Sequence, residues 1–171
     1  MERWGDVAAS IGAAGVGCIT GVPDSRTASL AALLGTVMPV VWAPREDVAV
    51  GFAVGVALGG GHPGILIQTS GFAAALDSVT SLGMEAGLGL TFLIGWCSTP
   101  EQAPQHHRLM DRSLPMLLQV LRIPFVVTGP DLRGSAQLSN WIRDRRHSGV
   151  HGVLLDIAGA ATLQSWDENA S

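Results

Sequence analysis

Residues 44–58 read PREDVAVGFAVGVAL, an acidic turn followed by roughly three helical turns that are apolar on every face. A helix that is hydrophobic all round belongs inside a protein, so we expect this segment to be buried between other layers. Gly51 and Gly55 share one face of it, where they allow another backbone or a ligand to approach closely. Glu46 then lies at the N-terminal end of a buried helix, partly shielded from water.

The position of Glu46 supports two interpretations. An acidic side chain in the first helical turn complements the helix macrodipole, which is a purely structural role. A carboxylate that is partly shielded from water can also hold or exchange a proton near neutral pH, which is a catalytic role. The helix by itself leaves both roles open.

The composition is typical of one compact domain. Of the 171 residues, 47% are hydrophobic and 14% are charged, and 22 are glycine. A chain of this length can build a single full core, and its low charge favours a surface partly covered by other subunits. The net charge is −4, and all ten basic residues are arginines, scattered except for Arg143, Arg145 and Arg146. This distribution does not form the basic patch that is typical of nucleic-acid-binding proteins.

Cysteine usage and the N-terminal segment favour a cytoplasmic location. Cys18 and Cys97 are too few for a disulfide scaffold or a zinc site. Charged residues within the first six positions are unlike a secretory signal. The longest uncharged apolar run, 48–61, is too short and too rich in glycine to span a bilayer.

Short apolar runs alternate with helical patterns along the chain, which predicts an α/β fold. We expect a doubly wound, mainly parallel, six-stranded sheet with helices on both faces, in one domain over residues 1–160, followed by a disordered C-terminal tail over 161–171. The predicted strands are 18–20, 38–42, 64–69, 90–96, 124–128 and 152–157. The predicted helices are 3–14, 26–34 after a cap at Asp24 or Ser25, 44–58, 73–86, 111–121 with Pro115 marking its first turn, and 135–146.

Ligands of such sheets bind at the carboxyl ends of the strands. In this chain those ends carry the turns 21–25, 44–46, 68–71 and 96–107, where the unusual polar residues lie. The sequence therefore predicts a site built from these four turns.

Several common sites are disfavoured. The glycines at 12, 15 and 17 precede a strand instead of following one, which is the wrong context for dinucleotide binding, and a chain without lysine has no P-loop. His106 and His107 are adjacent and lack metal-ligand spacing, so we predict no metal site; they are loop histidines, with substrate contact by His106 as the alternative. Cys97 is best read as a small apolar filler.

An ordered set of motifs resembles one known family. The motifs are Gly21-Val22-Pro23-Asp24-Ser25, Glu46-x4-Gly51-x-Ala53-x-Gly55, Gln68-Thr69-Ser70-Gly71, Thr80-Ser81-Leu82 and Pro104-Gln105-His106. Together, over residues 5–157, they look like the alpha subunit, or pyrimidine-binding domain, of the split thiamine-diphosphate decarboxylases that act on sulfopyruvate or phosphonopyruvate.

The resemblance implies roles for these residues. Glu46 would hydrogen-bond the aminopyrimidine ring of thiamine diphosphate and promote the imino tautomer that activates the cofactor. The residues lining the cofactor would be Pro23, Gln68, Thr69, Ser70 and Gly71. Those facing the substrate would be Asp24, Ser25, Gln105 and His106.

The resemblance also implies a partner. Enzymes of this family hold Mg²⁺ and the diphosphate with a Gly-Asp-Gly motif followed by an asparagine, and this chain has no Gly-Asp-Gly. A beta subunit carrying that motif would supply the metal and complete the active site in a hetero-oligomer.

Two departures bear on the substrate. The family usually has Trp-Arg-Gly after the fourth strand and asparagine before the Ser-Gly of the third turn, whereas this chain has Trp96-Cys97-Ser98 and Thr69. Loss of a bidentate cation weakens the case for a strongly anionic substrate, unless Arg108 or Arg112 replaces it. A split carboligase of the acyloin or acetolactate type, or a non-catalytic α/β module that binds a ligand or partner, are the alternative functions.

Overall fold

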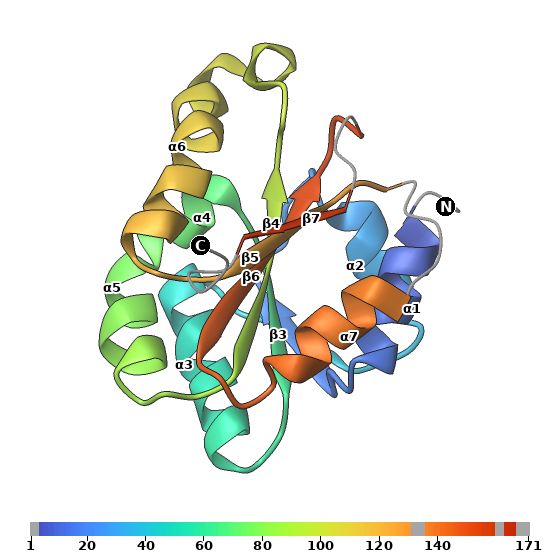
Figure 1. Ribbon diagram of the computed structural model, residues 1–171, viewed down its shortest axis with the longest axis vertical. Helices are drawn as coiled ribbons and strands as arrows, with labels where there is room; N and C mark the ends of the chain where they lie inside the picture. The colour runs from blue at the N-terminus through green and yellow to red at the C-terminus, as the bar shows by residue number, and fades with distance from the viewer. Residues whose placement is uncertain (1–3, 131–135, 160–162, 167–171) are drawn as a thin grey trace.

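The computed structural model describes residues 4–130, 136–159 and 163–166 (Figure 1). The helices are α1 (Gly5–Ala13), α2 (Ala28–Leu34), α3 (Glu46–Leu58), α4 (Thr69–Ala74), α5 (Leu76–Ser78), the π-helix η2 (Val79–Met84), the 3-10 turns η3 (Pro100–Gln102) and η4 (Gln105–His107), α6 (Arg108–Val120) and α7 (Ala136–Asp144). The strands are β1 (Cys18–Gly21), β2 (Val40–Trp42), β3 (Pro63–Gln68), β4 (Leu90–Trp96), β5 (Phe125–Thr128), β6 (Val150–Asp156) and β7 (Gln164–Trp166).

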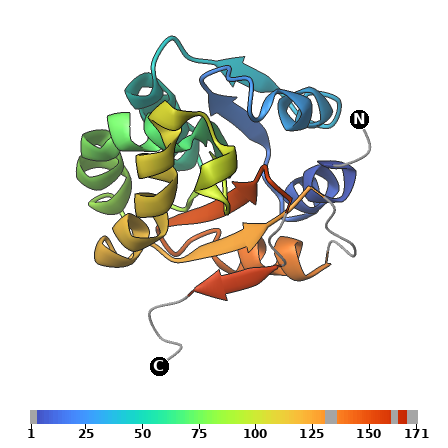
Figure 2. The same cartoon turned by 90° about the horizontal axis from the view of Figure 1, so that it is seen from above.

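One sheet in the order β2-β1-β3-β4-β6-β5-β7 forms the middle layer of the molecule. The first six strands run parallel to their neighbours, and β7 pairs antiparallel with β5. One face of the sheet packs on α1, α2 and α7, and the other on α3, α4 and α6, so each face has its own apolar core (Figures 1 and 2). The predicted doubly wound α/β fold is confirmed.

The seventh strand corrects the predicted strand count. Residues 164–166 fall in the predicted disordered tail, but they form β7 at the sheet edge, and the Trp166 ring stacks on Phe125 at 5.8 Å. A short edge strand can be held by a single buried contact and does not need a run of apolar residues. The hydrophobic pattern of the sequence therefore did not reveal β7. The rest of the tail, except Leu163, lies outside the described residues.

Two helices begin earlier than predicted. The segment expected to be helical from 73 already starts at Thr69, so the predicted cofactor-lining turn 68–71, called the pyrimidine turn below, leads into the first turn of α4. Helix α6 starts at Arg108, which places Pro115 in its interior instead of its first turn. A proline inside a helix leaves the carbonyl four residues earlier without its backbone donor, and here that carbonyl belongs to Asp111.

Helix α3 is not buried on every face, which corrects the expectation drawn from its sequence. Ala49, Val50 and Ala53 are fully buried against the sheet. Val48 and Phe52 are 46% and 40% exposed on the outer side. The described residues therefore cover one side of this apolar helix and leave the other side exposed. In the described part of the chain, no helix is long and apolar enough to cross a membrane.

Candidate functional site

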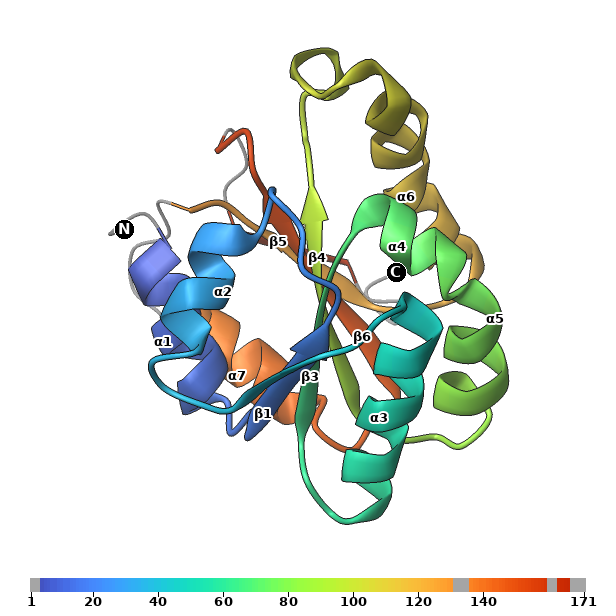
Figure 3. The ribbon, with the colours of Figure 1, turned by 180° about the vertical axis from the view of Figure 1, so that it is seen from behind.

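The carboxyl ends of the parallel strands gather the predicted site residues at one edge of the sheet (Figure 3). Glu46 is the first residue of α3 and is half-buried. Gly71 lies in the first turn of α4 and is buried. A Cβ atom at Gly71 would stand 2.8 Å from Oε1 and 2.9 Å from Cγ of Glu46. The structure thus brings the predicted catalytic carboxylate against the predicted pyrimidine turn.

The Glu46 carboxylate has no hydrogen-bond or ion-pair partner among the residues that the structure describes. Its neighbour Arg45 is engaged by Asp47, through Nε at 3.0 Å and Nη2 at 2.8 Å. That pairing holds the pKa of the exposed Asp47 carboxyl below its ordinary value. Glu46 is therefore left as a half-buried acceptor that no side chain in its own helix turn neutralises.

The residues of the pyrimidine turn differ in what they expose. Gln68 and Ser70 are half-buried at the edge of the sheet. Thr69 is fully buried, and its hydroxyl lies 2.8 Å from Asp111 Oδ1 and 3.0 Å from the Gly95 carbonyl. Its single proton is committed to one of these acceptors, so the Thr69 side chain is directed into the protein. A cofactor contact from Thr69 would come from its backbone.

Asp24 organises its own turn. Its Oδ1 accepts hydrogen bonds from the backbone N–H groups of Arg26 and Thr27 at 2.7 and 3.0 Å, and its Oδ2 accepts one from the Thr27 hydroxyl at 2.6 Å. These bonds shape the turn ahead of α2 and occupy both oxygens. They do not cap the helix as predicted, because α2 begins at Ala28 instead of Arg26, and its N-cap residue Thr27 makes no side-chain cap bond. Pro23 and Ser25 beside it are exposed.

A cavity of about 470 Å³ lies between α2 and the edge strand β2. Pro23, Asp24 and Trp42 stand at the end nearest the strand termini, and small residues of α2 line the rest. Glu46 and the pyrimidine turn are not among its lining residues. The structure therefore places Pro23 and Asp24 beside a cavity to which Glu46 does not contribute.

Gln105 and His106 lie in η4, on the segment 97–107 that rises above the sheet edge (Figures 1 and 3). Both side chains are exposed, and the rings of His106 and His107 are 4.2 Å apart. No described contact joins them to Glu46. Among the described residues, no group of three His, Cys, Asp or Glu is arranged to hold a metal ion.

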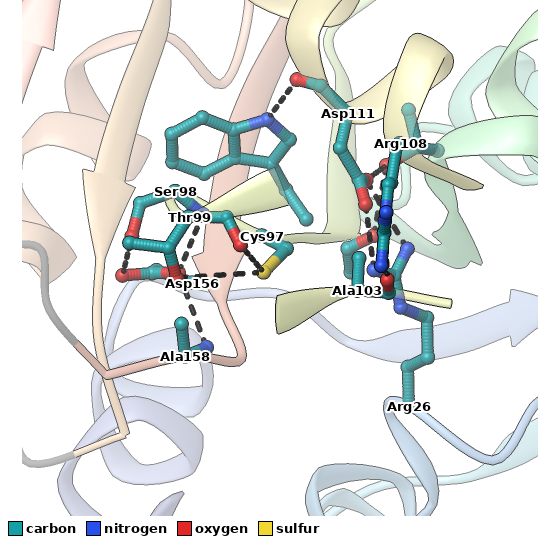
Figure 4. Close-up of polar contacts among 12 residues, drawn as sticks. Arg26, Cys97, Ser98, Thr99, Ala103, Arg108, Asp111, Asp156 and Ala158 are labelled. Atoms are coloured by element: carbon teal, nitrogen blue, oxygen red, sulfur yellow. Dashed lines mark hydrogen bonds and ion pairs between the residues drawn. The ribbon is translucent and has the colours of Figure 1, made fainter. Parts of the chain in front are cut away.

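The start of this segment is fixed to the end of β6 (Figure 4). The buried Asp156 accepts hydrogen bonds from the Ser98 backbone at 2.9 Å and the Ser98 hydroxyl at 2.7 Å. Cys97 is buried, and its thiol donates to the Thr99 carbonyl at 3.2 Å. That burial agrees with the interpretation of Cys97 as an apolar filler.

A buried ion pair that sequence reasoning missed fixes the other end of the segment (Figure 4). The Arg26 guanidinium binds both carboxylate oxygens of Asp111, at 3.2 and 2.7 Å, and the two side chains are 7% and 0% exposed. The residues are 85 positions apart, so no local spacing marks them as partners. The available signal was a charged residue in the first turn of an otherwise apolar helix face.

Two further arginines, Arg108 and Arg112, follow the segment 97–107 and form polar contacts with it. Arg112 forms an exposed ion pair with Glu101. Arg108 donates its Nε–H to the Ala103 carbonyl at 3.0 Å and has no carboxylate partner among the described residues.

The fold is a doubly wound sheet, and at the carboxyl ends of its strands Glu46, which has no partner among the described residues, lies against Gly71 of α4. The family profile "Thiamine pyrophosphate enzyme, N-terminal TPP binding domain" matches residues 5–114. The match spans more than half of the chain, so the chain belongs to this family, as the motifs predicted.

Sequence relatives point the same way. Residues of this chain are 24% identical, over 115 positions, to a sulfopyruvate decarboxylase of Methanosarcina acetivorans. The aligned part is 67% of this chain and 30% of the relative. The chain thus corresponds to about a third of that enzyme.

Solved structures share the fold. A thiamine diphosphate-dependent 4-hydroxybenzoylformate decarboxylase of Rhodococcus jostii superposes with a TM-score of 0.71 at 15% identity, covering 95% of this chain and 31% of that one. A 2-oxoglutarate:ferredoxin oxidoreductase of Magnetococcus marinus gives a TM-score of 0.58 at 13% identity, covering 97% and 30%. A split-gene transketolase, solved as an inactive beta4 tetramer, gives a TM-score of 0.57 at 16% identity. The superposition covers 90% of this chain and 50% of that one.

Proposed function

We propose that this chain is the alpha subunit of a two-component thiamine-diphosphate-dependent 2-oxo acid decarboxylase. The observation that carries the proposal is the half-buried Glu46 carboxylate, which has no described partner and lies against Gly71. A carboxylate kept free of protein donors is suited to accept a hydrogen bond from a ligand ring. The family match and the similarity to a sulfopyruvate decarboxylase support the assignment.

The residues around Glu46 fit an aminopyrimidine. Glu46 would share a proton with the ring nitrogen, and the absence of a side chain at Gly71 leaves room for the carboxylate. When bound, thiamine diphosphate supplies the electron sink for loss of carbon dioxide. Glu46 then holds and moves the proton at the ring nitrogen, and the turn 68–71 lines the ring.

The partner would be a beta subunit with the Gly-Asp-Gly and asparagine motif, which holds Mg²⁺ and the diphosphate. The observation that supports a partner surface is the exposed apolar face of α3, which starts near Glu46. Val48, Phe52 and Leu58 belong to that face. A subunit covering it would also complete the shielding of Glu46. Free Cys18 and Cys97 are compatible with a cytoplasmic complex.

The substrate class is a small 2-oxo acid. Arg26 and Arg112 are neutralised by Asp111 and Glu101, which leaves Arg108 as the segment's cation without a described carboxylate partner. Arg108 could replace the arginine that the family carries after the fourth strand, so sulfopyruvate-like acids and less charged 2-oxo acids are both candidate substrates. A split carboligase is the second candidate function, because this chain has Cys97 where the family carries that arginine.

Co-expression with the product of a neighbouring reading frame that encodes Gly-Asp-Gly followed by asparagine tests the proposal. We expect the two chains to co-purify, and the complex to bind thiamine diphosphate with Mg²⁺ and release CO₂ from 2-oxo acids. Each chain assayed alone is the control and should be inactive. A chain that neither assembles nor supports cofactor binding in any such mixture would instead be a binding module.

A further inference from the structure

Asp111 touches the ends of three parallel strands from one fully buried position. Its carboxylate binds Arg26, which follows β1, and accepts the Thr69 hydroxyl, which follows β3. Its carbonyl accepts the Trp96 Nε1–H at 2.6 Å, at the end of β4. Because Thr69 opens the pyrimidine turn and Asp111 follows the segment 97–107 directly, one side chain links both halves of the site.

The backbone contact depends on Pro115. Proline has no N–H to give to the carbonyl four residues earlier, and that carbonyl is the one on Asp111. The Trp96 indole supplies the missing donor. The N-terminal turns of α6 are therefore attached to the end of β4 by a bond to a carbonyl that has no backbone donor four residues later.

The ion pair is more informative about geometry than about stability. Moving two charges out of water costs several kcal/mol per ion, so a buried pair contributes little net stabilisation compared with apolar residues of similar volume. A bidentate arginine–carboxylate pair does fix distance and orientation. The third guanidinium nitrogen, Arg26 Nε, is buried without a partner among the described residues, so the pair is kept at some energetic cost.

We propose that Asp111 is a positioning residue of the active site. Through Arg26, Thr69 and Trp96 it holds the segment 97–107 and the pyrimidine turn in one arrangement, and so places Gln105 and His106 relative to Glu46. The expected effect on turnover rests on the proposed function. The structural link between the two segments is independent of it.

Three variants and a control separate positioning from stability. Asp111→Asn removes the charge opposite Arg26, and Thr69→Val removes the hydroxyl link without burying a charge. The double variant Arg26→Met, Asp111→Leu replaces the pair by apolar side chains and should recover the stability that Asp111→Asn loses. Glu101→Gln breaks the exposed Arg112 pair on the same segment and is the matched control.

Steady-state assays of the two-subunit complex give the first measurement. We expect the double variant to unfold within about 5 °C of the wild type, yet to have kcat/KM lowered about tenfold or more, as Thr69→Val also does. Glu101→Gln should keep the wild-type value. A double variant or Thr69→Val with wild-type kcat/KM overturns the positioning role, because a purely structural residue would lose and regain activity together with stability.

Hydrogen–deuterium exchange of the full chain gives a measurement that needs no activity. We expect Asp111→Asn and Thr69→Val to raise exchange in both 97–107 and 69–74, with no change in Glu101→Gln. Unchanged exchange in 97–107 overturns the link. If the wild-type complex releases no CO₂ while exchange rises in both segments, the link stands and the decarboxylase assignment fails.

Discussion

A Cβ atom on Gly71 would lie 2.8 Å from the Glu46 Oε1 atom, closer than a Cβ atom approaches any non-bonded heavy atom in proteins. The glycine is therefore required by the position of the carboxylate, since its φ is not in the left-handed region. This relationship connects the start of α3 to the start of α4, the two helices that carry the predicted catalytic and cofactor-lining residues.

Gly71→Ala should impair catalysis more than folding. The added methyl group must displace the Glu46 carboxylate, whose side chain can rotate away, so we expect kcat to fall about tenfold or more with a modest loss of stability. The comparison is Gly12→Ala in α1, where the new Cβ would find its nearest neighbour, Met38 Cε, at 3.8 Å. In that control the free energy of unfolding should rise by up to about 1 kcal/mol, and activity should be unchanged. Equal activity of both variants would contradict the close contact.

Phe52→Glu should prevent assembly without unfolding the chain. Phe52 is 40% exposed on the outer face of α3, so a charge there is tolerated in the isolated chain but not in a desolvated interface. Size-exclusion chromatography with the beta subunit would show separate components. Leu109→Glu on α6, at a side chain 74% exposed, is the control and should assemble normally. Normal assembly of Phe52→Glu would remove α3 from the interface.

Acid should destabilise the fold through two buried histidines at the amino ends of the strands. Thr91 Oγ1 lies 2.8 Å from Nε2 of both His62 and His151, and His151 Nδ1 lies 3.1 Å from the Gly149 carbonyl. Since a carbonyl only accepts, His151 carries its proton on Nδ1, Thr91 donates to His151 Nε2, and His62 donates to Thr91. Both rings are thus held neutral.

Burial lowers the pKa of His62 and of His151 to about 4, from 6.5, with Arg146 and His147 adding to the effect on His62 and Arg145 on His151. The unfolded chain binds these protons first as pH falls, so the stabilisation is complete above about pH 6.5 and is lost toward pH 4. The loss reaches roughly 3 kcal/mol per histidine. Urea unfolding from pH 8 to pH 4.5 measures it.

The matched variant for this prediction is His62→Gln, which keeps a donor for Thr91 and does not titrate. Its stability should decline less steeply between pH 6.5 and pH 4.5 than that of the wild type. A variant with the wild-type slope would show that His62 does not remain neutral in the folded chain.

The parts of the fold that depend on continuous apolar runs were predictable. The predicted strand 90–96 matches β4, because a strand buried on both faces reads as a nearly continuous apolar run, interrupted here by Thr91. The short strand β7 was not predictable, since a single Trp166 contact leaves no repeating pattern. The exposed face of α3 was predicted to be buried because its residues are apolar on every side, and apolar composition alone does not tell which side packs on the sheet.

The candidate site divides in the same way. Glu46 and Gly71 were placed at the sheet edge because turns after parallel strands meet there. The Arg26–Asp111 pair was missed because two residues 85 positions apart meet through the strand order, which motif spacing does not contain. The same pair shows why Thr69 faces inward, a direction that its position in the pyrimidine turn did not indicate.

The most direct measurement is CO₂ release by the two-subunit complex carrying Glu46→Gln, compared with Asp47→Asn. Both changes remove an acid from the first turn of α3, so both remove similar macrodipole stabilisation. The account predicts that Glu46→Gln loses turnover by about a hundredfold or more, while Asp47→Asn keeps turnover within about threefold of the wild type. Turnover that survives Glu46→Gln would contradict a catalytic role for Glu46 and leave it as a helix-start acid.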